Sequence, residues 1–204
     1  MDNMVITIGR QFGSGGRDIG RKLADKLNIP FYDKELILLA AKESEISPEI
    51  LKNVDEKKPD YWSYTASVSS VYDGSIASYN LPMTDKLFIA QSSVIKKLAE
   101  KGPCVIVGRC ADYILNEYNK CINLFIYSDI ESRIDRCINV YGISKDRPKE
   151  TILKTDKKRA AYYNFYTGQE WGNLNNYHLS VNSATIGIDG CVELITSFVK
   201  MAGK

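Results

Sequence analysis

Residues 4–17 of this chain read MVITIGRQFGSGGR. The run Met4–Ile8 is short and rich in β-branched residues, which favours a strand that ends at Gly9. After the glycines that follow, apolar residues recur with helical spacing at Ile19 and Leu23. The segment therefore predicts a strand, a glycine loop and a helix, which is how an α/β domain commonly begins.

The same alternation continues along the chain. Further strands are expected at Ile29–Tyr32, Cys104–Val107, Ile122–Tyr127 and Tyr177–Val181. Apolar stripes with helical spacing are expected at Leu87–Leu98, Ile130–Tyr141 and Val192–Val199, with a basic helical segment at Thr151–Tyr163. Five strands that alternate with helices predict a three-layer α/β fold around a five-stranded parallel sheet.

Composition narrows the class of protein. Of the 204 residues, 44% are apolar and 25% charged, which suits one domain with a full core over residues 1–204. Because 27 basic residues nearly balance 25 acidic ones, the net charge of +2 gives no reason to expect a nucleic-acid partner. The sequence contains no long uncharged apolar window, so it gives no reason to expect a membrane partner. The five cysteines form no C-x-x-C pair. We therefore expect a cytoplasmic protein with buried thiols and no structural zinc.

The alternation is interrupted between residues 44 and 85. This segment is charged and rich in Ser and Tyr, and Ser47 followed by Pro48 is typical of a helix start. We therefore interpret residues 44–85 as a helical insertion rather than as part of the core.

The glycine loop is a candidate anion site, because it lies between a strand and a helix N-terminus, where successive backbone amides can bind phosphate. The standard pattern G-x-x-x-x-G-K-[ST] is not met, since no lysine follows the glycines. Arg17 can supply the missing cation, and Asp18 can replace the hydroxyl that contacts magnesium. The expected phosphate-binding residues are Gly13, Ser14, Gly15, Gly16 and Arg17. A turn whose glycines only permit tight packing is the alternative.

A dinucleotide-binding fold is a competing interpretation. The G-x-x-x-G-x-G motif at residues 9–15, Asp33 at the end of a strand, and the pair Tyr141 and Lys145 are all typical of short-chain dehydrogenases. Gly142 lies between the tyrosine and the lysine, and it should break the helix that would place them on one face. This break argues against the catalytic geometry of a dehydrogenase. An NAD(P) oxidoreductase is nevertheless kept as an alternative function.

Three segments together resemble the cytidylate kinase-like family: Ile6–Arg17, Phe31–Asp33 and Val105–Arg109. The likeness spans nearly the whole chain. It implies a sheet of the P-loop kinase type, an acceptor-binding role for the insertion, and a lid at about residues 144–172. It also implies ATP with Mg²⁺ as the donor and a nucleoside monophosphate, CMP-like, or a related small molecule as the acceptor.

The resemblance also suggests roles for side chains. Arg109 follows the third core strand, as in the Gly-Arg-Asp element of cytidylate kinases, which implies acceptor binding by Arg109 and by Asp112, displaced three residues beyond it. The basic run Lys157, Lys158 and Arg159 resembles part of the lid that closes over the donor phosphates.

Arginine placement favours the same chemistry. The chain has eight arginines, and none lies between Lys22 and Gly108. Phosphoryl transfer needs cations that stabilise charge spread over equatorial oxygens. We expect catalytic roles for Arg17, Arg109 and Arg159. The donor-side candidates are Arg133 and Arg136, for which a solvated salt-bridge surface is the alternative.

Three further expectations concern single residues and partners. Asp33 can hold magnesium, orient the acceptor or cap the next helix. His178 is the only histidine and is expected to be structural. A group of aromatic residues near the predicted lid can pack internally or form a homodimer surface. Its members are Tyr162, Tyr163, Phe165, Tyr166 and Trp171.

Because the glycine loop lacks the standard lysine and hydroxyl, a non-catalytic nucleotide or anion sensor of the same fold is a second candidate function.

Overall fold

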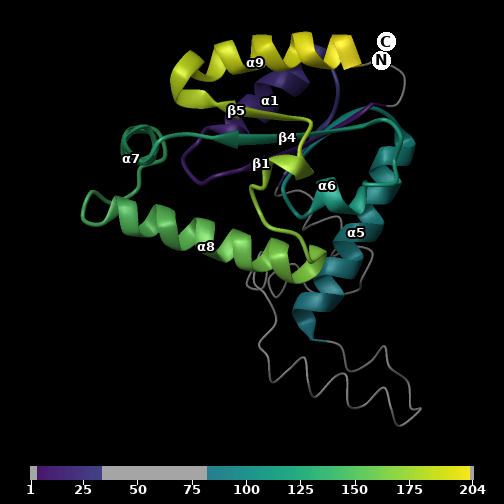
Figure 1. The fold of residues 1–204 in the computed structure, drawn as a ribbon, viewed down its shortest axis with the longest axis horizontal. Helices are drawn as coiled ribbons and strands as arrows, with labels where there is room; N and C mark the ends of the chain where they lie inside the picture. Colours follow the sequence, from purple (N-terminus) through teal and green to yellow (C-terminus); the bar gives the residue numbers. More distant parts are fainter. Residues whose placement is uncertain (1–3, 34–81, 203–204) are drawn as a thin grey trace.

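The computed structural model describes residues 4–33 and 82–202. Within these ranges, one parallel sheet has the strand order β2–β3–β1–β4–β5 (Figure 1). Its strands are β1 (Val5–Arg10), β2 (Phe31–Tyr32), β3 (Cys104–Val107), β4 (Cys121–Tyr127) and β5 (Leu179–Asn182). The predicted five-stranded parallel sheet is confirmed, and all five carboxyl ends consequently point toward the same edge.

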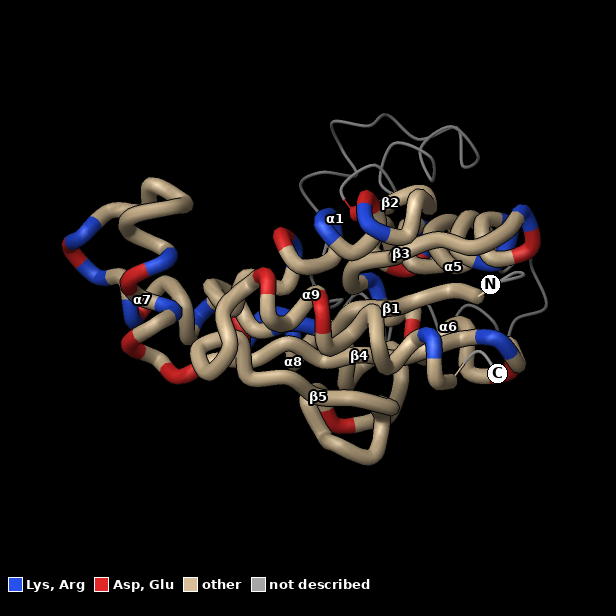
Figure 2. The backbone as a smooth tube through the Cα atoms, turned by 90° about the horizontal axis from the view of Figure 1, so that it is seen from above, with Lys and Arg blue, Asp and Glu red and all other residues tan. Residues whose placement is uncertain are grey.

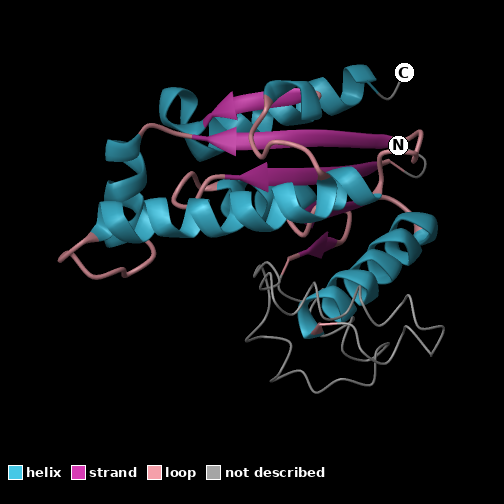
Figure 3. Ribbon diagram, turned by 60° about the horizontal axis from the view of Figure 1, so that its bottom comes forward, coloured by secondary structure: helices cyan, strands magenta, loops and turns pink. Residues whose placement is uncertain are grey.

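Helices cover both faces of this sheet, which gives the three predicted layers (Figures 1 and 3). The α-helices in the described residues are α1 (Gly16–Leu27), α5 (Met83–Lys101), α6 (Ala111–Ile114), α7 (Ile130–Asn139), α8 (Pro148–Thr167) and α9 (Ser183–Ala202). A short 3₁₀ helix, Leu174–Asn176, precedes β5. None of these helices has the length and apolar character that crossing a membrane requires.

The core follows from the period of two along the strands. Ile6 and Ile8 of β1 point to one face and join the apolar cluster formed with α1 and α9. Val5, in the same strand, points to the other face and joins the cluster formed with α5 and α6. Both faces of β1 are therefore buried, which is why the strand reads as a continuous apolar run.

Several element boundaries differ from the sequence prediction. β1 does not end at Gly9 but continues through Arg10, because Gly9 and Arg10 still pair with Phe125 and Ile126 of β4. β2 begins only at Phe31 rather than at Ile29. β5 begins at Leu179, so His178 lies just before it and is exposed. The Nδ1 atom of His178 accepts a hydrogen bond from the backbone amide of Asn123 at 2.8 Å. The extension of β1 places a charged side chain at the carboxyl edge.

The sequence pattern predicted the wrong buried face for the helix after β4. α7 ends at Asn139, before Tyr141, and its fully buried residues are Arg133 and Cys137 rather than the isoleucine stripe. Both buried residues lie against Gly13, because a Cβ atom added there would be 2.9 Å from the Arg133 carbonyl oxygen and from the Cys137 sulfur. α7 therefore packs against the glycine loop.

The predicted insertion lies largely outside the described residues. Of residues 44–85, the structure describes only 82–85, and the last three of these belong to the first turn of α5. Figure 2 shows basic and acidic residues interspersed along the described helices and loops, in line with the small net charge.

Candidate functional site

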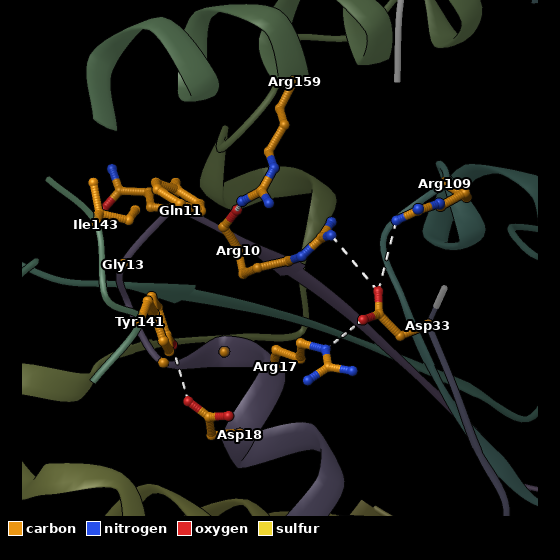
Figure 4. Close-up of a pocket in the computed structure, with 13 residues that line it drawn as sticks. Arg10, Gln11, Gly13, Arg17, Asp18, Asp33, Arg109, Tyr141, Ile143 and Arg159 are labelled. Atoms are coloured by element: carbon orange, nitrogen blue, oxygen red, sulfur yellow. Dashed lines mark hydrogen bonds and ion pairs between the residues drawn. The ribbon is translucent and has the colours of Figure 1, made fainter. Parts of the chain in front are cut away.

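A pocket of about 460 Å³ lies where the glycine loop leads from β1 into α1 (Figure 4). Four arginines from separate segments line it: Arg10, Arg17, Arg109 and Arg159. The three arginines that the sequence predicted as catalytic are thus brought together, and Arg10 joins them. Ligand pockets of open parallel sheets are expected at this carboxyl edge.

The loop backbone is held in a defined conformation. Gly13 and Gly15 have φ angles of 81° and 78°, in the left-handed region that favours glycine. The Oγ atom of Ser14 donates to the Gln11 carbonyl at 2.8 Å, and Nη1 of Arg136 donates to the Gly13 carbonyl at 2.9 Å. Tight packing therefore does require glycines here, and the same loop directs the N-terminus of α1 toward the pocket.

Asp33 is the electrostatic centre of the pocket. Its carboxylate is 3% exposed and accepts a hydrogen bond from Nε of Arg17 at 2.6 Å. Its other oxygen lies 3.7 Å from Nη1 of Arg109 and 4.0 Å from Nη2 of Arg10 (Figure 4). One carboxylate thus holds three guanidinium groups near each other. Since the pocket lining contains four arginines and two aspartates, it attracts a polyanion.

Only one member of the predicted lid run reaches the pocket. Arg159 in α8 donates from Nη1 to the Arg10 carbonyl at 3.2 Å, and its guanidinium lies 5.5 Å from the centre of the Phe12 ring. Lys157 and Lys158 are exposed and do not line the pocket. Successive helical residues point in different directions, which separates Arg159 from its neighbours.

The donor-side candidates Arg133 and Arg136 do not line the pocket either. Arg133 is buried and forms an ion pair with Asp156 of α8, and Arg136 is bound to the glycine loop, as described above. Both therefore support the walls of the site. The alternative of a solvated salt-bridge surface is also wrong for Arg133, whose partner comes from a neighbouring helix.

Asp112, predicted to bind the acceptor, is not among the residues that line this pocket. It is buried under α8 and accepts a hydrogen bond from the Tyr163 hydroxyl at 2.7 Å. Burial raises the pKa of this carboxyl group, and the hydrogen bond from Tyr163 only partly opposes the effect. Asp112 therefore connects α6 to α8.

Sequence reasoning missed Arg10 and Tyr141 as pocket residues. Arg10 follows the predicted strand end directly, so its position beside the loop was a usable signal. The Tyr141 hydroxyl donates to Asp18 at 2.9 Å, and burial raises the pKa of Tyr141, which keeps it a neutral donor. Lys145 is exposed and does not line the pocket, so the tyrosine–lysine pair of a dehydrogenase is not formed on a helix.

Comparison with protein families matches residues 5–185 to the cytidylate kinase-like family. Among curated relatives, a cytidylate kinase from Saccharolobus islandicus (strain Y.G.57.14 / Yellowstone #1) is 18% identical over 201 residues, covering 98% of this chain and 93% of the relative. A second cytidylate kinase, from strain L.S.2.15 / Lassen #1 of that organism, has the same identity and coverage.

Solved structures share the architecture. An uncharacterized protein from Eubacterium ventriosum ATCC 27560 superposes with a TM-score of 0.70 and 28% identity, covering 97% of this chain and 98% of that one. A shikimate kinase from Bacteroides thetaiotaomicron superposes with a TM-score of 0.55 and 15% identity over the same shares of the two chains. At that identity the likeness shows the fold alone, which this chain shares with that shikimate kinase.

Proposed function

This chain belongs to the cytidylate kinase-like family, and we propose that it transfers the γ-phosphoryl group of ATP to a nucleoside monophosphate, CMP-like, or to a related small acceptor. The observation that carries the proposal is the convergence of four guanidinium groups on one pocket beside the glycine loop. Phosphoryl transfer depends mainly on positioning and on charge stabilisation, and such a cluster supplies both.

The proposed roles follow from the place of each group. The amides of the glycine loop and the N-terminus of α1 bind the donor phosphates. Arg17 and Arg159 stabilise the charge that develops on the transferred group, and Arg109, at the end of β3, holds the acceptor. Asp33 positions the arginines, and no covalent intermediate with the protein forms.

Magnesium enters this proposal with ATP, as part of the substrate. Within the described residues, no three His, Cys, Asp or Glu side chains cluster to hold a metal. Asp33 does not suit magnesium, because its oxygens already face guanidinium groups. Asp18 does suit it, since one carboxylate together with substrate phosphates is a common magnesium environment. Bound magnesium would neutralise charge on the phosphate oxygens.

A coupled assay with ATP, magnesium and a panel of nucleoside monophosphates tests the proposal. Arg17→Ala should lower kcat/KM by about 10²-fold or more, because it removes a cation from the pocket. Arg21→Ala is the matched control: Arg21 lies one turn further along α1, exposed over the Phe31 ring and outside the pocket. Equal activity of the two variants would contradict the proposed role.

Two other outcomes identify the alternatives. Nucleotide binding without product from any acceptor would favour the non-catalytic sensor, which the missing loop lysine motivates. Thermal stabilisation by NAD(H) but not by ATP with magnesium would favour the oxidoreductase. A cytoplasmic location and a homodimer stay predictions from the sequence.

A further inference from the structure

Arg10 is packed between two glycines that are far apart in the sequence. A Cβ atom added at Gly16 would lie 2.6 Å from Cβ and 3.2 Å from Cγ of Arg10. A Cβ atom added at Gly108 would lie 2.1 Å from Nη1 of Arg10 and 2.9 Å from its Cζ. Gly16 therefore leaves space for the stem of the arginine, and Gly108 leaves space for its guanidinium.

The glycine at position 16 is not required by its backbone. Gly13 and Gly15 have positive φ angles, but Gly16 does not, and it is the first residue of α1. An ordinary helical residue would fit that backbone conformation. The contact that excludes a side chain here comes from outside the helix: the Arg10 stem and, at 3.2 Å, Cβ of Ile126.

Position 16 is also where the standard phosphate-binding loop carries its lysine. In the pattern G-x-x-x-x-G-K-[ST] the lysine directly follows the last glycine and opens the helix. In this chain the last loop glycine is Gly15, the N-cap of α1, and Gly16 takes the lysine position. A lysine at position 16 would overlap the stem of Arg10, so the two cations are alternatives for one space.

We propose that Arg10 replaces this lysine as the cation that binds the donor phosphates, reaching the site from the end of β1 instead of from the start of α1. Its side chain lines the pocket and is 11% exposed. A guanidinium can bind two phosphate oxygens at once, which a lysine ammonium cannot do with the same geometry. This inference rests on the proposed function and explains how the altered loop can still bind ATP.

Asp33 serves as a positioning residue in this arrangement. Its Oδ1 atom lies 4.0 Å from Nη2 of Arg10 and 3.7 Å from Nη1 of Arg109, longer than hydrogen bonds. The carboxylate therefore offsets the repulsion between these two cations, which both line the pocket (Figure 4). A phosphate group that enters the pocket can then accept hydrogen bonds from them.

The first test measures ATP–magnesium binding by titration calorimetry, with turnover followed in parallel. Arg10→Ala should weaken ATP binding at least tenfold, and Arg10→Lys should recover part of the loss because it restores a positive charge on a flexible stem. Arg21→Ala should bind ATP like the wild type. Unchanged ATP affinity in a folded Arg10→Ala variant would overturn the inference. ATP binding and turnover are measured separately. If the wild-type protein binds ATP but transfers no phosphoryl group, the proposed function fails, while the inference about Arg10 is still tested by ATP affinity.

The second test uses Gly108→Ala to displace the guanidinium while Arg10 itself stays unchanged. The added methyl group should weaken ATP binding in the wild type and should have little further effect in Arg10→Ala, where the overlapping atoms are gone. Gly142→Ala controls for the positive φ angle, since Gly142 has a φ of 67° and, among the described residues other than its two chain neighbours, none has an atom within 4 Å of an added Cβ. If the losses of ATP affinity caused by Gly108→Ala and by Arg10→Ala simply add in the double variant, the inference is overturned.

Discussion

The Oδ1 atom of Asp156 accepts a hydrogen bond at 2.7 Å from the backbone amide of Phe12, 144 residues away in the chain. The same carboxylate pairs with the buried guanidinium of Arg133, so one side chain of α8 holds both the glycine loop and α7. Near the C-terminal end of α8, Tyr166 stacks on Phe88 of α5, with ring centres 4.1 Å apart. The helix within the segment predicted as a lid is thus fastened at its middle and near its C-terminal end.

Removing the Asp156 carboxylate should destabilise the fold. Asp156→Ala leaves the Arg133 charge buried without its partner, and we expect a loss of about 3 kcal/mol in the free energy of unfolding. Asp156→Asn should cost less, because its amide oxygen can still accept from Phe12. Glu150→Ala in the same helix removes only an exposed pair with Arg147 and should change stability by less than about 1 kcal/mol. Urea unfolding of the three variants measures this order, and equal losses for Asp156→Ala and Glu150→Ala would contradict it.

A methyl group at Gly13 should be poorly tolerated. It would force a non-glycine residue to a φ of 81° and lie 2.9 Å from both the Arg133 carbonyl oxygen and the Cys137 sulfur. Strain and overlap together should cost about 2–4 kcal/mol. Gly142→Ala carries only the backbone strain, about 1 kcal/mol. Thermal unfolding compares the two variants, and a Gly142→Ala variant as unstable as Gly13→Ala would argue against a packed loop.

Asp112 should make stability depend on pH. Because burial raises its folded-state pKa above the ordinary value of 3.8, the folded chain binds this proton more tightly than the unfolded chain does. The contribution of the Asp112 carboxyl group to the stability of the fold is fully present below pH 3.8, and it is lost as pH rises through the raised pKa. Asp112→Asn removes the titration, so its stability relative to the wild type should increase as pH rises from about 4 toward neutrality.

Chemical unfolding at a series of pH values measures this difference. Asp25→Asn, at an exposed position of α1, controls for the loss of one negative charge. A difference between Asp112→Asn and the wild type that is the same at every pH would show that the buried carboxyl group does not titrate in this way.

Asp18 should affect the magnesium requirement. If its carboxylate contacts magnesium carried by ATP, Asp18→Asn should raise the magnesium concentration needed for half-maximal turnover, and excess magnesium should restore part of the rate. The assay varies magnesium at fixed, saturating ATP, with Asp25→Asn as the control on the same helix. An unchanged magnesium dependence with a lower rate would assign Asp18 to positioning Tyr141 instead.

Local patterns were sufficient for most of the fold. The buried strand Cys104–Val107 and the helix with Ile19 and Leu23 were predicted correctly, because their apolar period appears within a few residues. The end of β1 was not, since Gly9 only weakens a strand and pairing with β4 carries it on to Arg10. The buried face of α7 was also wrong, because Arg133 finds its counter-charge on α8, which no local spacing reveals.

For this protein, the order of apolar and glycine residues by itself determined the alternation of strands and helices, and with it the parallel sheet and the place of the glycine loop. Only the tertiary structure decided which charged groups meet there: Arg10 passes between Gly16 and Gly108, and Asp33 faces three guanidinium groups. Secondary structure follows from neighbours a few residues apart. The site depends on contacts between distant segments, whose partners are set by the path of the folded chain.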